Sequence, residues 1–120
     1  MYKVLIVDDE EIILESLEEY FEDEGYEVLT AESAEEGFKK CDTIDAAIVD
    51  MKLKQHNGND LIVKMHAKNP NAIYFVHTGS ITYKLPSALV RLGLTKKNIF
   101  TKPIKDLSII GERIKELREK

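Results

Sequence analysis

Four apolar segments of the chain each stop at residues whose side chains could do chemistry. Those residues are Asp8 and Asp9, Asp50, His77 and Thr78, and Lys102 and Pro103. In an open α/β sheet, ligands bind outside the carboxyl ends of the strands. We therefore expect three carboxylates, a hydroxyl and an ammonium group to gather at one edge. That set of groups suits a divalent cation and a phosphoryl group.

The adjacent acids Asp8 and Asp9 are the first candidates for binding a metal. Two neighbouring ionised carboxylates repel each other, so a cation must offset their charge where they are partly buried. Mg²⁺ is a hard ion that takes oxygen ligands from one or two carboxylates and keeps several waters. The alternative is that one of the acids only caps the following helix, where acidic groups are favoured. A third acid at a neighbouring strand end, Asp50, favours the metal site.

Asp50, Thr78 and Lys102 are the candidates for handling a phosphoryl group. A carboxylate at the end of a very apolar strand is costly unless it is paired or liganded, and it can act as a nucleophile toward phosphorus. A hydroxyl can bond a phosphoryl oxygen, and a lysine can neutralise its charge. Taken singly, Asp50 could be a cap or turn residue, Thr78 a strand-end hydroxyl and Lys102 a surface lysine. Their shared placement after predicted strands favours the chemical interpretation.

Five strands and five helices alternate in the pattern that the sequence predicts. Continuous β-branched runs predict buried strands, and apolar residues three and four apart predict helices. The predicted strands span residues 3–8, 26–31, 45–50, 72–77 and 98–101. The predicted helices span residues 11–24 and 34–41, a segment after Gly58 to about Lys68, a short segment near Pro86, and about 106–119. Short crossovers of this kind give a parallel sheet with helices on both faces.

Local signals support several of these boundaries. Gly25 is expected at the C′ position that closes the first helix, and Ser33 with Glu36 three residues later predicts a capping box for the second. Pro86 is expected in the first turn of the short fourth helix. Residues 79–84, by contrast, are predicted to form a loop.

Composition narrows the possible functions. The 120 residues suit one domain, with 43% hydrophobic and 32% charged residues. No apolar stretch approaches the roughly 20 residues of a membrane helix, and with a strand predicted to begin at residue 3 we expect no signal peptide. A single cysteine, Cys41, excludes an internal disulfide and a thiolate zinc site, so a cytoplasmic location is expected. The net charge of −5 argues against nucleic acid and favours a protein or small-ligand partner.

These residues together make the chain resemble the receiver domains of two-component response regulators, of the chemotaxis-regulator type. The matching residues, in order along essentially the whole chain, are Asp8-Asp9, Asp50, Gly58, Thr78-Gly79 and Lys102-Pro103. The resemblance implies a (βα)5, doubly wound, flavodoxin-like α/β fold with strand order 2-1-3-4-5. It also implies one receiver domain over residues 1–120, with no effector domain in this chain.

The resemblance assigns a metal-binding role to four residues. Asp9 would ligate Mg²⁺ directly and Asp8 largely through water, while the carboxylate of Asp50 and the backbone carbonyl of Lys52 would complete the protein ligands. Magnesium is therefore the expected cofactor.

The resemblance also assigns the phosphoryl chemistry. Asp50 would be the phosphoacceptor, Thr78 would move toward the phosphoryl group, and Lys102 would pair with it. Pro103 would follow a cis peptide bond, which is seen almost only before proline. The chain would catalyse only its own phosphorylation and dephosphorylation and would otherwise not be an enzyme.

The implied phosphodonor is a sensor histidine kinase or a histidine phosphotransfer protein, and the implied output is a change in binding to a downstream protein target. Neither nucleic acid nor a membrane is an expected partner, and the chain would be a monomer or a phosphorylation-dependent dimer. One alternative is a degenerate receiver that only binds proteins. A less favoured alternative is an aspartyl-phosphate phosphatase, since Lys52 stands where such enzymes usually place a second aspartate.

The chain departs from the family pattern at Ile99, at Lys54 and over residues 79–98. Ile99 replaces an aromatic residue that swings inward with the threonine, which puts the usual readout in doubt. Lys54 replaces a proline four residues after Asp50. Lys52 and Ser80 occupy positions at which the family tunes dephosphorylation. Residues 79–98 look unusual, and we expect a late, short and mobile or displaced fourth helix there.

Overall fold

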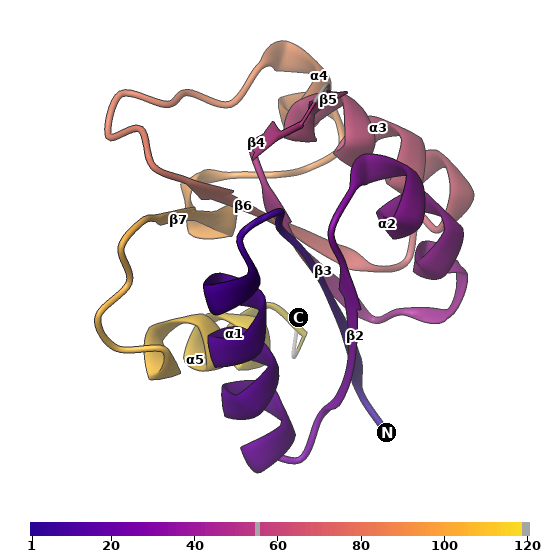
Figure 1. Cartoon of the computed structure of the whole chain (residues 1–120). Coiled ribbons are helices and arrows are strands. Elements are labelled where there is room, and N and C mark those ends of the chain that lie inside the picture. The colour runs from indigo at the N-terminus through magenta and orange to yellow at the C-terminus, as the bar shows by residue number, and fades with distance from the viewer. Residues whose placement is uncertain (55, 119–120) are drawn as a thin grey trace.

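A parallel sheet of five strands forms the centre of the molecule, as the computed structural model shows for residues 1–54 and 56–118 (Figure 1). The strands are β1 (Lys3–Val7), β2 (Glu27–Ala31), β3 (Ala46–Asp50), β6 (Ile73–Thr78) and β7 (Ile99–Thr101). They lie in the order β2-β1-β3-β6-β7, which confirms the predicted fold class and strand order. The carboxyl ends of all five strands consequently point the same way.

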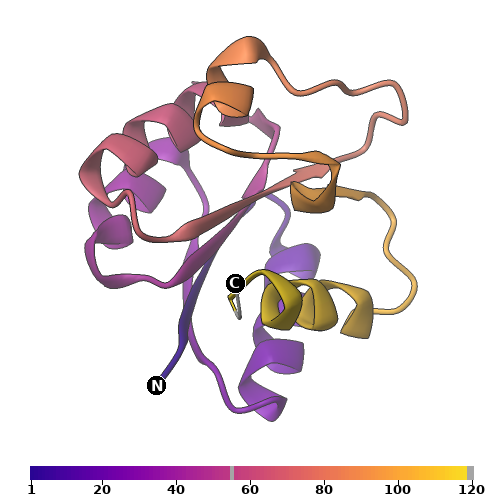
Figure 2. The same cartoon turned by 180° about the vertical axis from the view of Figure 1, so that it is seen from behind.

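Helices cover both faces of this sheet (Figures 1 and 2). One face carries α1 (Glu11–Asp23) and α5 (Ser108–Arg118). The other face carries α2 (Ala34–Lys40), α3 (Gly58–Lys68) and the short α4 (Ser87–Arg91). Two 3₁₀ turns, Cys41–Thr43 and Lys96–Asn98, lead into β3 and β7. Within the described part of the chain, no helix is both long enough and apolar enough to cross a membrane.

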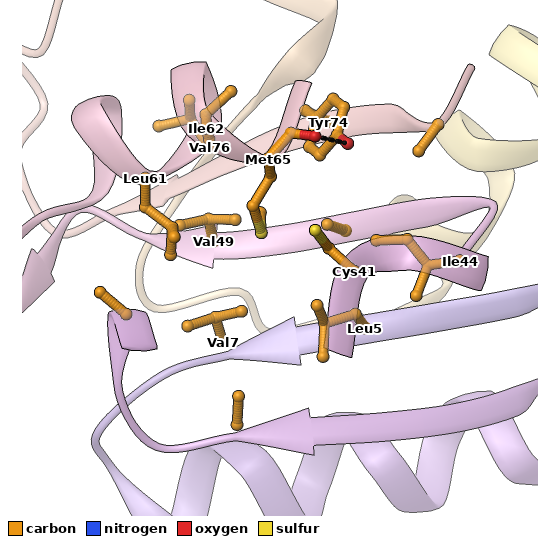
Figure 3. Close-up of a cluster of buried hydrophobic side chains, with 14 of the residues drawn as sticks. Leu5, Val7, Cys41, Ile44, Val49, Leu61, Ile62, Met65, Tyr74 and Val76 are labelled. Atoms are coloured by element: carbon orange, nitrogen blue, oxygen red, sulfur yellow. Dashed lines mark hydrogen bonds between the residues drawn. The ribbon is translucent and has the colours of Figure 1, made fainter. Parts of the chain in front are cut away.

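Alternating side chains of the strands divide the core into two clusters. Leu5 and Val7 of β1 pack with α2 and α3, in the cluster that Figure 3 shows. Val4 and Ile6 pack on the opposite side with α1 and α5. Because side chains alternate along a strand, a residue that continues the even-numbered series, such as Asp8, faces the α1–α5 side.

The local signals for helix ends are largely confirmed. Gly25 has a positive φ of 91°, which favours glycine at this helix end. Ser33 caps α2 by accepting the N–H of Glu36, but the carboxylate of Glu36 accepts from the N–H of Glu32 rather than from Ser33. The placement of Pro86 in the first turn was wrong by one position. Pro86 is the N-cap of α4, with an extended ψ of 156°.

Two segments differ from the prediction. A small antiparallel hairpin, β4 (Lys52–Leu53) with β5 (His56–Asn57), lies between the predicted strand that ends at residue 50 and the predicted helix after Gly58, where the sequence predicted no strand. The last helix starts at Ser108 instead of Asp106, because the carboxylate of Asp106 accepts hydrogen bonds from the backbone N–H and the hydroxyl of Ser108. The predicted end of this helix, residue 119, lies outside the described residues. The fourth helix is late and short, as predicted, and its mobility stays a prediction.

Candidate functional site

Four carboxylates meet at the carboxyl edge of the sheet. One oxygen from each of Asp8, Asp9, Glu10 and Asp50 lies within 4.8 Å of the others. The side chains of Asp8 and Asp50 are buried, whereas that of Asp9 is half-buried and that of Glu10 is exposed. The structure thus brings the three predicted acids together. It also adds Glu10, which the sequence signals only by following the acidic pair directly.

Two hydrogen bonds fix the chain around Asp8. The N–H of Asp8 donates to the carbonyl of Ala31 at the end of β2, at 3.0 Å. Asp8 Oδ1 accepts the N–H of Glu10 at 2.9 Å, which turns the chain into α1. Glu10 is the N-cap of α1, and its own side chain makes no capping hydrogen bond. The interpretation of Asp8 or Asp9 as a helix cap therefore does not account for the pair.

Lys102 sits among these acids. Its Nζ lies 3.1 Å from Asp8 Oδ2, 3.3 Å from Asp50 Oδ1 and 3.3 Å from Glu10 Oε1. The backbone N–H of Lys102 donates to the carbonyl of Thr78 at 2.7 Å, which ties this residue to the end of β6. The peptide bond between Lys102 and Pro103 is cis, as the family resemblance implied. Lys102 is therefore a half-buried group in a charge cluster and not a surface lysine.

The electrostatics of the cluster are dominated by burial. Burial raises the pKa of Asp50, and the neighbouring Asp8 raises it further, while Lys102 and the N–H of Lys52 oppose the rise. Burial likewise raises the pKa of Asp8, against the hydrogen bond from Glu10 and the charge of Lys102. Burial alone would lower the pKa of Lys102, but the charges of Asp8 and Asp50 raise it overall. The positive charge and hydrogen bonds around Asp8 and Asp50 thus do not fully offset the cost of burying their negative charges.

The donor set fits a hard divalent cation. Among the described residues, four carboxylates meet here and one ammonium group, that of Lys102, pairs with three of them, so the cluster keeps an excess of negative charge. Asp8 Oδ2 lies close to Lys102 Nζ but receives no well-aligned hydrogen bond. A buried carboxylate oxygen in this position has a free lone pair for a metal or its water.

Thr78 and Asp50 line one cavity of about 260 Å³. The lining residues come from the ends of four strands, β1, β3, β6 and β7, and from the segments that follow them: Glu10, Asp50, Met51, Lys52, Thr78, Gly79, Ser80 and Lys102. Thr78 is the last residue of β6, and its Oγ1 accepts the N–H of Ser80 at 3.1 Å. Asp50 Oδ1 also accepts the N–H of Lys52 at 3.2 Å, so the expected turn contact of Asp50 exists beside its charge contacts. The structure places Asp50, Thr78 and Lys102 around one space.

His77 and Ile99 do not line this cavity. His77 is 5% exposed, its Nε2 has no hydrogen-bond partner among the described residues, and burial lowers its pKa to about 4. Ile99 pairs with Val76 in the register of β6 and β7 and packs against the cluster on the α2–α3 side. Lys54, the replacement for proline, is exposed in the hairpin.

Comparisons with known proteins agree with this arrangement. The model of the response regulator receiver domain family matches residues 4–114. A receiver domain protein described as CheY-like, from Methanospirillum hungatei JF-1, superposes with a TM-score of 0.84 at 30% identity, over 99% of this chain and 98% of that chain. The response regulator TrrA of Thermotoga maritima, solved in complex with Mg(2+)-BeF, superposes with a TM-score of 0.82 at 27% identity, over 98% and 99%.

One curated relative is much longer than the matched segment. The cyclic di-GMP phosphodiesterase of Thermotoga maritima is 36% identical over 75 residues, which cover 62% of this chain and 20% of that protein. The matched part is therefore about a fifth of that relative. The likeness carries no phosphodiesterase activity over to this chain.

Proposed function

The chain belongs to the response regulator receiver domains, and from this premise we propose that it is a phosphorylation-dependent switch whose phosphoacceptor is Asp50. The donor is a phosphohistidine of a sensor histidine kinase or of a histidine phosphotransfer protein. The proposal rests above all on one observation: Asp50 Oδ1 lies 3.3 Å from Lys102 Nζ in a cavity that Thr78 also lines. A nucleophile, a cation and a hydroxyl thus converge where a phosphoryl group would bind.

The proposed transfer is a single displacement. A carboxylate oxygen of Asp50 attacks phosphorus, and the bond from phosphorus to the histidine nitrogen of the donor breaks. That nitrogen keeps the electron pair as the phosphoryl group passes to Asp50. Lys102 stabilises the negative charge on the phosphoryl oxygens, and the hydroxyl of Thr78 donates to one of them. The short distances from Lys102 to Asp50 and Asp8 support this role.

Asp8, Asp9 and Asp50, together with the backbone carbonyl of Lys52, are the residues that would hold Mg²⁺. When bound, the ion offsets the negative charge of the carboxylates and of the phosphoryl oxygens. The excess of carboxylates over ammonium groups in the cluster supports this assignment. The similar TrrA, which was solved with Mg(2+)-BeF, adds support by analogy.

Phosphorylation would then alter protein–protein contacts. The aspartyl phosphate adds roughly two negative charges at the edge of the sheet, and Thr78 with the adjoining loops rearranges around them. A pre-existing equilibrium between two arrangements shifts accordingly. In this proposal the whole chain, residues 1–120, is one receiver domain that acts in the cytoplasm on a protein target, as a monomer or a phosphorylation-dependent dimer. Its only chemistry is its own phosphorylation and dephosphorylation.

The two alternatives have weaker support. A degenerate receiver that only binds proteins would not need a buried acid pair beside Lys102, because burying these charges is costly. An aspartyl-phosphate phosphatase would need an acid two residues after the nucleophile, and Lys52 stands there.

The test is the intact mass of the protein after incubation with Mg²⁺ and acetyl phosphate or phosphoramidate. We expect the wild type to gain one phosphoryl group only when Mg²⁺ is present. Asp50→Asn should gain none, whereas Asp23→Asn, an exposed acid at the end of α1, should behave as the wild type. If the wild type neither forms the adduct nor binds Mg²⁺, the switch is wrong and the protein-binding alternative is favoured.

A further inference from the structure

The segment from Gly79 to Pro86, which we call the strap, joins β6 to α4 and borders the phosphoryl cavity. It leaves the edge of the sheet directly after Thr78 and arches over to α4 (Figures 1 and 2). Gly79 and Ser80 line the cavity itself, whereas Ile81 is 89% exposed. The strap therefore connects the proposed phosphoryl-binding hydroxyl to the rest of the α2–α3 side.

One end of the strap is held by Thr78. The side chain of Thr78 accepts the N–H of Ser80 at 3.1 Å. The carbonyl of Ser80 in turn accepts the N–H of Tyr83 at 3.3 Å. These two hydrogen bonds form a short, continuous chain of contacts from the hydroxyl of Thr78 to the backbone of Tyr83. A turn of the Thr78 hydroxyl consequently either breaks its hydrogen bond with Ser80 or moves the strap as far as Tyr83.

The other end of this chain of contacts is anchored on α3. The hydroxyl of Tyr83 donates to Asn59 Oδ1 at 2.5 Å. The ring of Tyr83 is half-buried against the α2–α3 core, and burial raises the pKa of its hydroxyl, which therefore stays a donor. Asn59 belongs to the first turn of α3, where its own N–H is held by the N-cap side chain of Asn57 at 2.7 Å. The anchor is thus a well-packed helix and not another loop.

Thr78 cannot serve the strap and a phosphoryl group equally well. In the structure its hydroxyl accepts from Ser80, and it makes no hydrogen bond to Asp50 among the described residues. Threonine is branched at Cβ, so its side chain has few χ1 positions, and turning Oγ1 toward Asp50 carries it away from the N–H of Ser80. The strap could follow that turn only if Tyr83 also moved.

We propose that the Tyr83–Asn59 hydrogen bond is a clasp that holds the strap, and through it the hydroxyl of Thr78, in the unphosphorylated position. Tyr83 and Asn59 would then be positioning residues for phosphoryl binding, although neither lines the cavity. This inference rests on the proposed function, because it assumes that Thr78 binds the phosphoryl group. It adds a control of the switch that runs through α3.

The expected sign follows from linkage. A contact that is made in only one of two arrangements stabilises that arrangement, and its removal shifts the equilibrium toward the other. Removing the hydroxyl of Tyr83 should therefore favour binding of the phosphoryl group. The net effect of one neutral hydrogen bond corresponds to about 2- to 10-fold in an equilibrium constant.

The experiment measures the dissociation constant of beryllofluoride, a phosphoryl mimic, in the presence of Mg²⁺ by calorimetry. The proteins are the wild type, Tyr83→Phe, Asn59→Ala and the double variant. Tyr26→Phe serves as the matched control, because Tyr26 packs in the cluster on the opposite face of the sheet. Each clasp variant should bind about 2- to 10-fold more tightly, and the double variant should match the singles because both substitutions break one bond. The control should equal the wild type.

Hydrogen exchange supplies a readout without any ligand. In the free protein, Tyr83→Phe should speed exchange at the amides of Ser80 and Tyr83, while the amides of β1 stay unchanged. Unchanged or weaker beryllofluoride binding by Tyr83→Phe, or additive effects in the double variant, would overturn the clasp while leaving the proposed function intact. A wild type that binds no beryllofluoride would instead overturn the proposed function and the clasp together.

Discussion

The two sides of the phosphoryl cavity are held in very different ways. On the acid side, Asp50 ends β3, whose five residues are all buried, and Asp8 follows β1, which is paired on both edges. On the other side, β7 has three residues, only one of them buried, and a single neighbouring strand. The groups that must present a fixed pattern of charge thus stand on rigid strands. Thr78, the group that must rearrange, ends β6, which pairs on one side with this short edge strand.

The helices repeat this contrast. On the face opposite α1 and α5, α3 has 11 residues and buries three large apolar side chains, whereas α4 has five residues and buries one, Leu89. A short helix has few internal hydrogen bonds to lose when its surroundings change. The strap (Gly79 to Pro86) is held by the firmly packed α3 at one point and leads into the weakly packed α4. It can therefore move while α3 stays in place. We therefore expect equivalent substitutions to lower the free energy of unfolding more on the acid side than on the side of β7 and the strap.

The largest expected difference concerns two apolar residues, one in each region. Leu5 in β1 is fully buried, whereas Ile99 in β7 is only half-buried. Leu5→Ala should lower the free energy of unfolding by about 3–4 kcal/mol, because it leaves a cavity in a dense core. Ile99→Ala should lower it by only about 1–2 kcal/mol, because less apolar area is lost. Urea unfolding measures both values, and equal losses would contradict the contrast between the two sides.

Two glycines offer a second test. A Cβ on Gly58 would lie 2.3 Å from the carbonyl oxygen of Asp50 and 2.9 Å from the Cα of Met51, so the backbone next to the phosphoacceptor would have to shift. A Cβ on Gly79 in the strap would meet no heavy atom within 4 Å. Gly58→Ala should therefore cost about 2–3 kcal/mol of stability and slow the gain of a phosphoryl group by Asp50.

Gly79→Ala is the matched control for this change. It should leave stability unchanged or raise it by up to about 1 kcal/mol, because alanine restricts the unfolded chain. Urea unfolding and the rate of adduct formation with acetyl phosphate check both variants. A Gly79→Ala variant as damaged as Gly58→Ala would show that the strap is as tightly constrained as the acid side.

The same contrast explains what the sequence could predict. The strands β1, β3 and β6 carry continuous apolar runs that end in polar residues. The existence of these strands, and the meeting of Asp8, Asp50 and Thr78 at their carboxyl ends, could therefore be inferred from topology rules. The helix boundaries at Gly25 and Ser33 followed from local hydrogen bonding and φ. These features depend on neighbours in the sequence or on burial, both of which leave a pattern.

Features that depend on weak local pairing, or on a partner far along the chain, left no such pattern. The hairpin of β4 and β5 arises from pairing of residues with weak strand propensity, and the N-cap placement of Pro86 depends on where the strap ends. Tyr83 and Asn59 are 24 residues apart, and neither residue type marks a contact between a loop and a helix. The inclusion of Glu10 in the acid cluster depends on how α1 leaves the sheet edge.

Two neighbouring residues of β6, His77 and Thr78, lie in contrasting surroundings. His77 and Thr78 point to opposite sides of the sheet because side chains alternate along a strand. Thr78 faces the strap, while His77 is buried beside α1 and Lys102, in a cavity that Ile13 and Leu107 also line. Burial, reinforced by the charge of Lys102, lowers the pKa of His77 from 6.5 to about 4.

This shift predicts a specific loss of stability in acid. Between pH 6.5 and pH 4 the unfolded chain binds a proton at His77 that the folded protein excludes, so the free energy of unfolding falls as the pH falls. Relative to pH 7, the loss attributable to His77 should reach about 2 kcal/mol at pH 5 and level off below pH 4. Asp8 and Asp50 have raised pKa values and contribute with the opposite sign, so the wild-type profile alone cannot isolate the histidine.

Comparing the wild type with a His77→Leu variant does isolate the contribution of the histidine. His77→Leu removes the titrating ring but keeps an apolar side chain in the same space, and the acids contribute equally to both proteins. The gap in the free energy of unfolding between the variant and the wild type should therefore widen in favour of the variant from pH 7 to pH 5, as urea unfolding at each pH measures. A gap that stays constant would mean that the ring takes up its proton in the folded state. Water would then reach the α1–α5 face of the sheet at His77. The dry, rigid packing inferred for the acid side would not extend beyond Asp50.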